Sequence, residues 1–200
     1  MTDLEKYQIR DARLDDCKDL ARMIDGSSDG AVTYLYENLK PGISPVDVMC
    51  EQLKSEVHYS YANSLVVECD EKIVAMALSF PSSGLQLDSN LLENFDLVRQ
   101  QYFRYFIDNR INDSWHLDAI YVDGVYRSSG LGRRLLEKVK HSAIEFGFPV
   151  LQVYVFESNK AAIKFYCDNG FSQVKKIELD AHVFLKRHGS LLLMKCNLSV

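Results

Sequence analysis

The chain has few cysteines, and their positions do not suggest a structural role. All five are far apart and none forms a C-x-x-C pair, so neither a disulfide framework nor a zinc site is indicated. Internal repeats and low-complexity tracts are also missing. These absences favour an ordinary globular protein of a reducing compartment, and no metal site is predicted.

Long apolar runs are absent as well. The longest, at 73–78 and 191–194, fall far short of the roughly 20 residues that a helix needs to span a bilayer. The first eight residues, MTDLEKYQ, are charged where a signal peptide would be apolar. We therefore predict a cytoplasmic protein with no membrane partner.

Basic residues are not in excess, because 23 Lys and Arg stand against 28 Asp and Glu, for a net charge of −5. Such a chain repels phosphate backbones, so no nucleic-acid partner is predicted. With 47% hydrophobic and 26% charged residues, the composition is typical of folded proteins. Two hundred residues are enough for one domain and too few for two ordinary ones, so we predict a single domain over 1–200.

Alternating and helical spacings of apolar residues divide the chain into strands and helices. Strands are predicted at 7–13, 64–70, 72–80, 115–122, 150–156, 171–179 and 191–197. Helices are predicted at 14–25, twice within 29–57 on either side of a Pro-Gly break, and at 91–106, 130–146 and 159–169. This order indicates an α/β fold, with a mixed sheet of six or seven strands flanked by helices.

One loop has the pattern of an anion site. Residues 127–132, RSSGLG, join the strand 115–122 to the next helix, where backbone N–H groups and a helix N-terminus attract an anion. Its two glycines let the main chain approach a bulky ligand. Residues 127–141 hold five basic residues and one acidic residue, which favours a phosphate-rich ligand. The alternative is a tight turn followed by a solvated basic helix face.

Two common phosphate loops do not fit this segment. The dinucleotide fingerprint G-x-G-x-x-G needs glycine at position 135, where the chain has Leu135. The P-loop needs Gly-Lys followed by Ser or Thr, and no such sequence occurs in the chain. Both classes of nucleotide-binding loop are therefore excluded.

The segment 115–175 resembles the GNAT family of N-acetyltransferases. The resemblance lies in the R-x-x-G-x-G loop after a strand, in Asn159 at the start of the next helix, and in the sequence Phe165-Tyr166-x-x-x-Gly170-Phe171. It implies the GNAT (acyl-CoA N-acyltransferase) fold and an acetyltransferase that uses acetyl-CoA as cosubstrate without a metal. The hairpin at 64–80 and the first strand and helix agree more loosely with that fold, and 81–114 has no counterpart in it.

The resemblance also implies roles for individual residues. The loop that holds the pyrophosphate of acetyl-CoA matches Arg127, Ser128, Ser129, Gly130, Leu131 and Gly132. The strand edge that pairs with the pantetheine amides matches Ile120, Tyr121 and Val122. Asn159 is expected to hydrogen-bond the cofactor arm, and Tyr166 to protonate the departing thiolate. The family usually has Gly-Lys or Gly-Arg where Ser128-Ser129 stands, so one cation near the phosphates is lost here.

Acyl transfer to an amine needs a base, because a primary amine of pKa about 10.4 is almost wholly protonated at neutral pH. Asp118 is the best-placed carboxylate, since it lies in the strand WHLDAIYV among apolar neighbours, where an unpaired charge is costly. It resembles the acidic base of some family members. The alternative is an ion pair or a backbone contact, and Asp123 and His116 are weaker candidates for the base.

Direct transfer in a ternary complex is predicted, rather than transfer through a covalent acyl-enzyme. Cys167 is next to Tyr166, but a free cysteine on a short amphipathic helix is usually a small core residue. No histidine has the sequence context of a Cys–His pair.

The segment 81–114 is predicted to be a helical insertion. A stripe recurs every three or four residues at Leu91, Phe95, Val98, Tyr102 and Phe106. The helix either packs on the core, or forms a wall of the acceptor site, or makes a homodimer contact. Together with 29–57, this segment is expected to shape the acceptor pocket.

Three functions stay open on the sequence. The first is an N-acetyltransferase that acts on an amine, either a small molecule or a peptide, whose identity the sequence does not give. The second is a non-catalytic CoA-binding sensor or scaffold, and the third is an interaction protein built round the aromatic insertion. Turnover separates the first from the second, and CoA binding separates both from the third.

Overall fold

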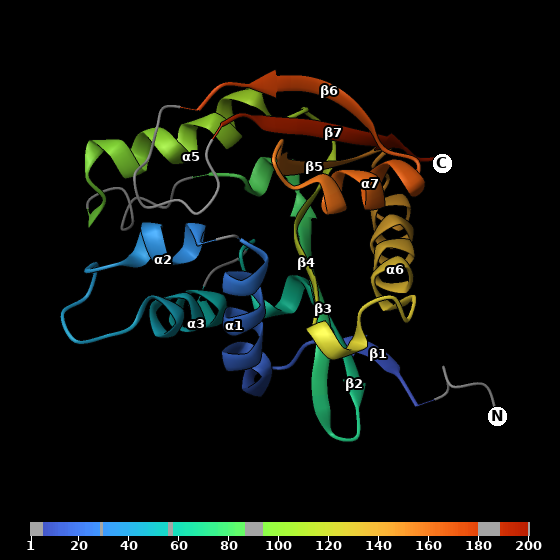
Figure 1. Cartoon of the computed structure of the whole chain (residues 1–200), viewed down its shortest axis with the longest axis horizontal. Coiled ribbons are helices and arrows are strands. Elements are labelled where there is room, and N and C mark those ends of the chain that lie inside the picture. Colours follow the sequence, from blue (N-terminus) through green and yellow to red (C-terminus); the bar gives the residue numbers. More distant parts are fainter. Residues whose placement is uncertain (1–5, 29, 56–57, 87–93, 180–188, 200) are drawn as a thin grey trace.

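The computed structural model describes residues 6–28, 30–55, 58–86, 94–179 and 189–199, and it confirms a mixed sheet of seven strands (Figure 1). The strands lie in the order β1-β2-β3-β4-β5-β7-β6 across the sheet. Their bounds are β1 Gln8–Asp11, β2 Ser64–Cys69, β3 Lys72–Pro81, β4 Trp115–Val122, β5 Val150–Phe156, β6 Ser172–Ile177 and β7 Leu191–Asn197. Each overlaps a strand that the apolar spacing predicts.

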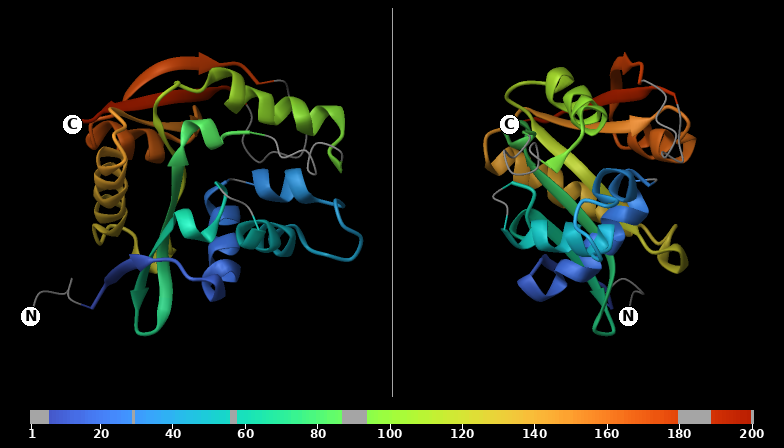
Figure 2. Two further views of the ribbon diagram at one scale, coloured as in Figure 1. Left: turned by 180° about the vertical axis from the view of Figure 1, so that it is seen from behind. Right: turned by 90° about the vertical axis from the view of Figure 1, so that its left-hand side faces the viewer.

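Helices cover both faces of the sheet. Their bounds are α1 Cys17–Ser27, α2 Ala31–Tyr36, α3 Pro45–Ser55, α5 Leu97–Asn109, α6 Leu131–Glu145 and α7 Lys160–Asp168. Short 3-10 turns are η1 Leu14–Asp16, η2 Tyr61–Asn63, η3 Ser82–Gly84 and η4 Gly124–Tyr126. Figures 1 and 2 show α6 and α7 on one face and α1, α2, α3 and α5 on the other. Among the described residues, no helix combines the length and apolarity that a membrane span requires.

Local sequence signals set the ends of the helices. Pro45 begins α3 as predicted, and the Ser44 hydroxyl before it accepts a hydrogen bond from the Asp47 amide at 3.2 Å. Gly147 follows α6 with φ +81°, the left-handed stop that the sequence predicts. The apolar stripe of α6 ends earlier than predicted, because Phe146 is 70% exposed where the helix terminates.

Within the aromatic insertion, helix α5 spans Leu97–Asn109 and so ends three residues beyond the predicted end at 106. Helix α5 begins at Leu97, because Asp96 caps it by accepting a hydrogen bond from the Arg99 amide at 2.8 Å. Val98 was predicted to belong to the buried stripe, and this is wrong, since it is 55% exposed. Tyr102 is buried as predicted, and Leu91 lies outside the described residues.

Strands β4 and β5 are paired over only part of their length. They run parallel, with Trp115 opposite Leu151 at one end of the pairing and Leu117 opposite Val153 at the other. Beyond this point β4 continues alongside β3, and β5 continues alongside β7. The two central strands therefore diverge within the sheet, and the far half of β4 has one edge that does not pair with β5.

A bulge in β4 lies where this divergence begins. Ser79 of β3 is opposite Leu117 and Leu78 is opposite Ala119, so Asp118 is the extra residue of the pair. One extra residue reverses which face the following side chains occupy. Leu117 packs beneath α6, but Ala119 packs on the opposite face, among the N-terminal helices.

Candidate active site

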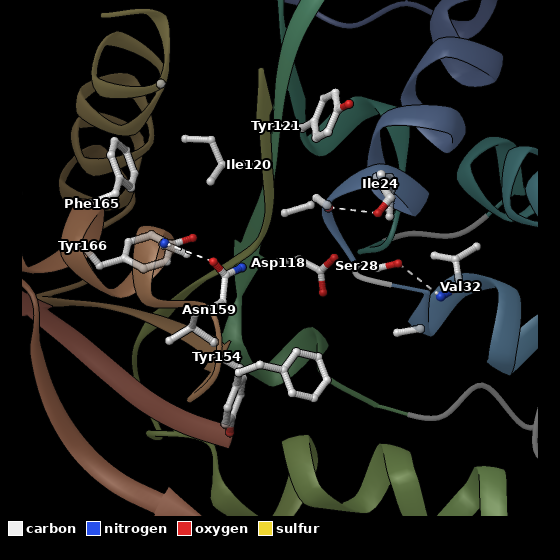
Figure 3. A pocket seen from close by; sticks show the side chains of 18 of the residues that line it. Ile24, Ser28, Val32, Asp118, Ile120, Tyr121, Tyr154, Asn159, Phe165 and Tyr166 are labelled. Carbon is white, nitrogen blue, oxygen red and sulfur yellow. Dashed lines mark hydrogen bonds between the residues drawn. The ribbon is translucent and has the colours of Figure 1, made fainter. Parts of the chain in front are cut away.

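A cavity of about 1650 Å³ opens where β4 and β5 diverge (Figure 3). One end is lined by the loop 127–132, the far half of β4 and α7. The other end is lined by the C-terminus of α1, by α2, α3 and α5, and by Tyr154 of β5. Asp118 lies between the two ends. Every residue predicted for the site lines this cavity except Ser129.

The loop before α6 is shaped by two residues of positive φ. Ser128 has φ +63° and Gly130 has φ +83°, the left-handed region that only glycine adopts without strain. Such turns point successive backbone N–H groups to one side and form an anion-binding concavity next to the N-terminus of α6. The Ser129 hydroxyl donates to the Tyr126 carbonyl, so this side chain closes the turn instead of lining the cavity.

The basic charge at this end of the cavity comes from fewer side chains than the sequence suggests. Of the five basic residues in 127–141, Arg127 and Arg133 line the cavity. The Arg127 guanidinium donates to the Val122 carbonyl at 3.1 Å and lies 5.8 Å from the centre of the Tyr121 ring. Lys140 is directed elsewhere, since it donates to the Asn169 carbonyl at 3.0 Å.

The far half of β4 presents Ile120, Tyr121 and Val122 to the cavity, each half-buried. The Tyr121 ring lies against α1 at Gly26, where a Cβ atom would stand 2.9 Å from the ring. Any larger residue at position 26 would therefore displace the Tyr121 ring. Gly132 is less constrained, because a Cβ there would meet Phe165 and Val122 at ordinary contact distances of 3.6 to 3.7 Å.

Helix α7 contributes Asn159 and Tyr166 to the cavity. Asn159 caps the helix, since its side-chain oxygen accepts a hydrogen bond from the Ala162 amide at 3.2 Å (Figure 3). The Tyr166 ring packs between Phe165 and Phe171, and its hydroxyl makes no hydrogen bond to the part of the chain that the structure describes. Burial, reinforced by the negative charge of Asp118, raises the pKa of Tyr166 and keeps the hydroxyl protonated.

The cysteine next to Tyr166 does not take part in the cavity. Cys167 is exposed, so the prediction that it is a small core residue is wrong. It lies on the outward side of α7, away from the residues that line the cavity.

Asp118 is partly shielded, with 21% of its side chain exposed, and it faces the cavity. Its Oδ1 atom lies 3.5 Å from Nε2 of the buried His116. Tyr59 lies near enough for the charge of Asp118 to add to the burial that raises the pKa of its hydroxyl. Asp123, the other acidic candidate, is paired with Arg22 at 3.3 Å and lies outside the cavity lining.

Three tyrosines surround the Asp118 carboxylate, and two of them were missed by the sequence. Burial raises the pKa values of Tyr59, Tyr102 and Tyr166, and the charge of Asp118 adds to each shift. All three hydroxyls thus stay neutral beside one carboxylate. Tyr59 precedes β2 and Tyr102 is on α5, so no local pattern links either residue to β4.

Helix α5 packs on the core and also lines the cavity, which are two of the three roles that the sequence left open for it. Tyr102 is buried against Tyr34 of α2, while Phe103, Phe106 and Ile107 also line the cavity. Within the described ranges, no three His, Cys, Asp or Glu side chains are grouped closely enough to hold a metal ion.

Comparison with known proteins gives a consistent family. The model of the acetyltransferase (GNAT) family matches residues 34–171. No curated protein matches the chain. Among solved structures, an acetyltransferase superposes with a TM-score of 0.70 at 21% identity, over 96% of this chain and all of that one.

Two further structures share this fold. An N-acetyltransferase from Staphylococcus aureus Mu50 has a TM-score of 0.70 at 22% identity, over 94% of this chain and 99% of its own. The protein yncA from Salmonella typhimurium, solved with its cofactor acetyl-CoA, has a TM-score of 0.59 at 20% identity, over 97% of this chain and 95% of its own. At these identities the likeness concerns the fold.

Proposed function

The chain belongs to the acetyltransferase (GNAT) family, and we propose that it transfers the acetyl group of acetyl-CoA to an amine, with both substrates bound at once. One observation carries the proposal. The divergence of β4 from β5 leaves a free strand edge inside a cavity whose two ends meet at a carboxylate. An extended cosubstrate and a separate acceptor can enter such a cavity from opposite ends.

The residues at the loop end fit acetyl-CoA. Backbone N–H groups of 127–132 and the N-terminus of α6 suit its pyrophosphate, and Arg127 and Arg133 add two positive charges there. The edge of β4 at 120–122 suits the amide-bearing pantetheine arm, because an extended chain can pair with a free strand edge. Arg133 takes the place of the cation that the family usually has at 128–129, one helical turn further along the chain.

The two catalytic candidates divide the proton transfers between them. Asp118 accepts a proton from the acceptor ammonium, directly or through water, so that the amine nitrogen can attack the thioester carbonyl carbon. A C–N bond forms and the C–S bond breaks, and the sulfur leaves as a thiolate. Tyr166 then donates its hydroxyl proton to that thiolate, and burial keeps this hydroxyl protonated until it is needed. The acylated nitrogen loses a second proton as the amide forms, so that one of the two protons restores the Tyr166 hydroxyl and the other passes to solvent, which leaves Asp118 ionised.

The position of Cys167 supports direct transfer. Cys167 is exposed and outside the cavity lining, so it is badly placed to carry an acetyl group between the substrates. We expect intact-mass spectrometry after exposure to acetyl-CoA alone to show no acetylated cysteine. A stable acetyl adduct on any cysteine would replace the ternary mechanism by a covalent one.

Titration calorimetry with acetyl-CoA tests the cofactor site. We expect binding to be abolished by Gly130→Asp, which brings a carboxylate next to the phosphates. Gly130→Asn is the matched control, since it imposes the same size and backbone strain without the charge, and it should retain much more binding. Gly124→Asp places the same charge in η4, outside the cavity lining, and should bind normally. Absence of binding to the unaltered protein would exclude acetyl-CoA as its ligand.

The non-catalytic alternative is tested by turnover. Release of free CoA is followed with a thiol reagent in the presence and absence of amines. Amine-dependent release that is lost in Asp118→Asn and Tyr166→Phe is expected of the enzyme. A sensor or scaffold would bind acetyl-CoA and release none of its thiol with any amine.

A further inference from the structure

The cavity is charged at one end only. Among the described residues its lining includes four formally charged ones, and three of them, Arg127, Arg133 and Asp168, belong to the loop, α6 and α7. We use the term acceptor compartment for the other end, which is lined by the C-terminal end of α1, by parts of α2, α3 and α5, by His58 and Tyr59, by residues 84–86 and by Tyr154. Within the described residues, Asp118 is the one formally charged group that borders this compartment.

Two arginines of the surrounding segments donate to backbone carbonyls and do not line the compartment. Arg110 donates to the Leu85 carbonyl at 2.8 Å, and Arg99 donates to the Glu37 carbonyl at 2.9 Å. Neither guanidinium belongs to the cavity lining. An acceptor carboxylate or phosphate placed here would lose its water without gaining a positive partner, which is strongly unfavourable.

Aromatic and aliphatic side chains make up most of the compartment wall. Phe106 packs edge-on against Tyr102, with ring centres 5.3 Å apart, and against Tyr154, with ring centres 5.0 Å apart. The opposite wall is aliphatic, from α1, α2 and α3, with Ile24, Val32, Leu35 and Met49. Such a surface stabilises an apolar body by removing it from water.

Burial raises the pKa values of two tyrosines of the compartment, Tyr59 and Tyr102, and the charge of Asp118 adds to both shifts. The other polar side chains of the lining include Gln52, His58 and Gln86. An ammonium group next to Asp118 would thus meet a carboxylate, neutral hydroxyls and aromatic rings, all of which favour a cation. A second ammonium further into the compartment would meet none of the carboxylates of the described chain.

Resting on the proposed function, we propose that the acceptor is a small monoamine with an apolar body. Its ammonium group is held at Asp118, and its apolar body lies between α5 and the helices α1, α2 and α3. Free amino acids and polyamines are poor acceptors, because each brings a second charged group into a compartment whose described residues offer no further partner of opposite charge. Selectivity among acceptors is therefore determined by the group at the end of the molecule opposite the reacting amine, and not by the amine itself.

Three amines of equal chain length test this inference: hexylamine, 6-aminohexanoate and 1,6-diaminohexane. They differ only in the group at the far end, which is neutral, negative or positive. We expect kcat/KM for hexylamine to exceed that for either of the others by at least tenfold, with release of CoA as the readout. Equal or better use of the acid or the diamine overturns the inference, and so does faster acetylation of a lysine-containing peptide.

Two variants test whether residues of the acceptor compartment determine the selectivity between amines. Ile107→Asp adds a carboxylate to its α5 wall and should raise the kcat/KM ratio of diaminohexane to hexylamine by at least tenfold. Val98→Asp makes the same change on the exposed side of α5, outside the cavity lining, and should leave the ratio unchanged. An unchanged ratio in folded Ile107→Asp overturns the inference, with circular dichroism as the check of folding.

A measurement of acetyl-CoA binding distinguishes failure of the proposed function from failure of the acceptor inference. If calorimetry detects no acetyl-CoA binding, the proposed function fails, and the acceptor inference fails with it. If acetyl-CoA binds and a charged-tail amine is preferred, or none of the three amines is acetylated, only the acceptor inference fails.

Discussion

Nε2 of His116 lies 3.5 Å from Oδ1 of Asp118, on the strand that carries Asp118 into the cavity. The imidazole is held in place by packing, with ring centres 5.5 Å from Phe80 and 5.8 Å from Tyr154. His116 itself is buried and does not line the cavity. We therefore expect His116 to orient the carboxylate, as a positioning residue for Asp118.

Removing this contact should impair catalysis without impairing acetyl-CoA binding. We expect His116→Leu to lower kcat about tenfold, because a misoriented base transfers a proton less well. His116→Gln, whose side-chain amide nitrogen can occupy the position of Nε2, should recover most of that loss. Calorimetric Kd values for acetyl-CoA should be the same in all three proteins. A general loss of folding in both variants would assign His116 a purely structural role.

The Asp118 carboxylate should matter most at neutral pH. Asp118→Asn is expected to lower kcat about 10²- to 10⁴-fold at pH 7, since most of the amine is then protonated. The loss should shrink as the pH rises toward about 10, because free amine then forms without a base. The pH profile of kcat is the measurement, with Asp123→Asn as the control outside the cavity. A deficit of constant size at every pH would show that Asp118 does not act as the base.

Tyr166 should remain a proton donor well into the alkaline range. Burial disfavours the phenolate, so the pKa of Tyr166 is raised and the hydroxyl stays protonated above the usual value of about 10. We therefore expect kcat not to decline between pH 8 and 10. Tyr166→Phe should lower kcat about 10²-fold over this range. Tyr61→Phe, outside the cavity lining, is the control, and a decline of wild-type kcat near pH 9 would point to another acid.

A buried ion pair far from the cavity should set part of the acid stability. The Asp16 carboxylate accepts hydrogen bonds from the Arg10 guanidinium at 2.7 and 3.2 Å and from the Arg13 amide at 2.7 Å. The Arg10 hydrogen bond is the main cause that lowers the pKa of Asp16 below its usual value. This contribution to stability is complete at neutral pH and is lost as the pH falls through the lowered pKa.

Urea unfolding of Asp16→Ala measures this contribution. We expect the free energy of unfolding at pH 7 to fall by about 2 kcal/mol, typical of hydrogen bonds to a charged group. At a pH below the lowered pKa the difference from wild type should become smaller, since the wild-type carboxylate is then protonated. A difference that stays constant with pH would mean that packing, not the charge of Asp16, supplies the stability.

The loop end of the cavity could be predicted because its residues are close together in the sequence. The glycine loop occupies six consecutive residues, and Asn159 and Tyr166 fall on one helix that follows it. Fixed spacing therefore identifies this end without knowledge of the fold. The role of Arg133 was harder to see, because a helix exposes basic side chains on several sides and only the fold selects the one that faces the cavity.

The acceptor compartment could not be predicted in the same way. The segments 29–57 and 81–114 were expected to shape it, but its wall also includes the end of α1, Tyr59 and Tyr154, and no pattern in the sequence links these to the rest. The partnership of Asp118 with Tyr59 depends on tertiary packing across the bulge of β4. The bulge itself is a single-residue shift, and an apolar strand with mixed alternation does not reveal one.

The short pairing of β4 with β5 also determines how the molecule can open. Three residue pairs join the two parts of the sheet, β1–β4 and β5–β7. Beyond these pairs, the described residues of β4 and β5 are not paired, so the two parts of the sheet can separate there without breaking a backbone hydrogen bond between the two strands. Helix α6 opposes this separation, because it packs across β3, β4 and β5. A change in the width of the cavity can thus come from repacking of side chains around α6, with the secondary structure left intact.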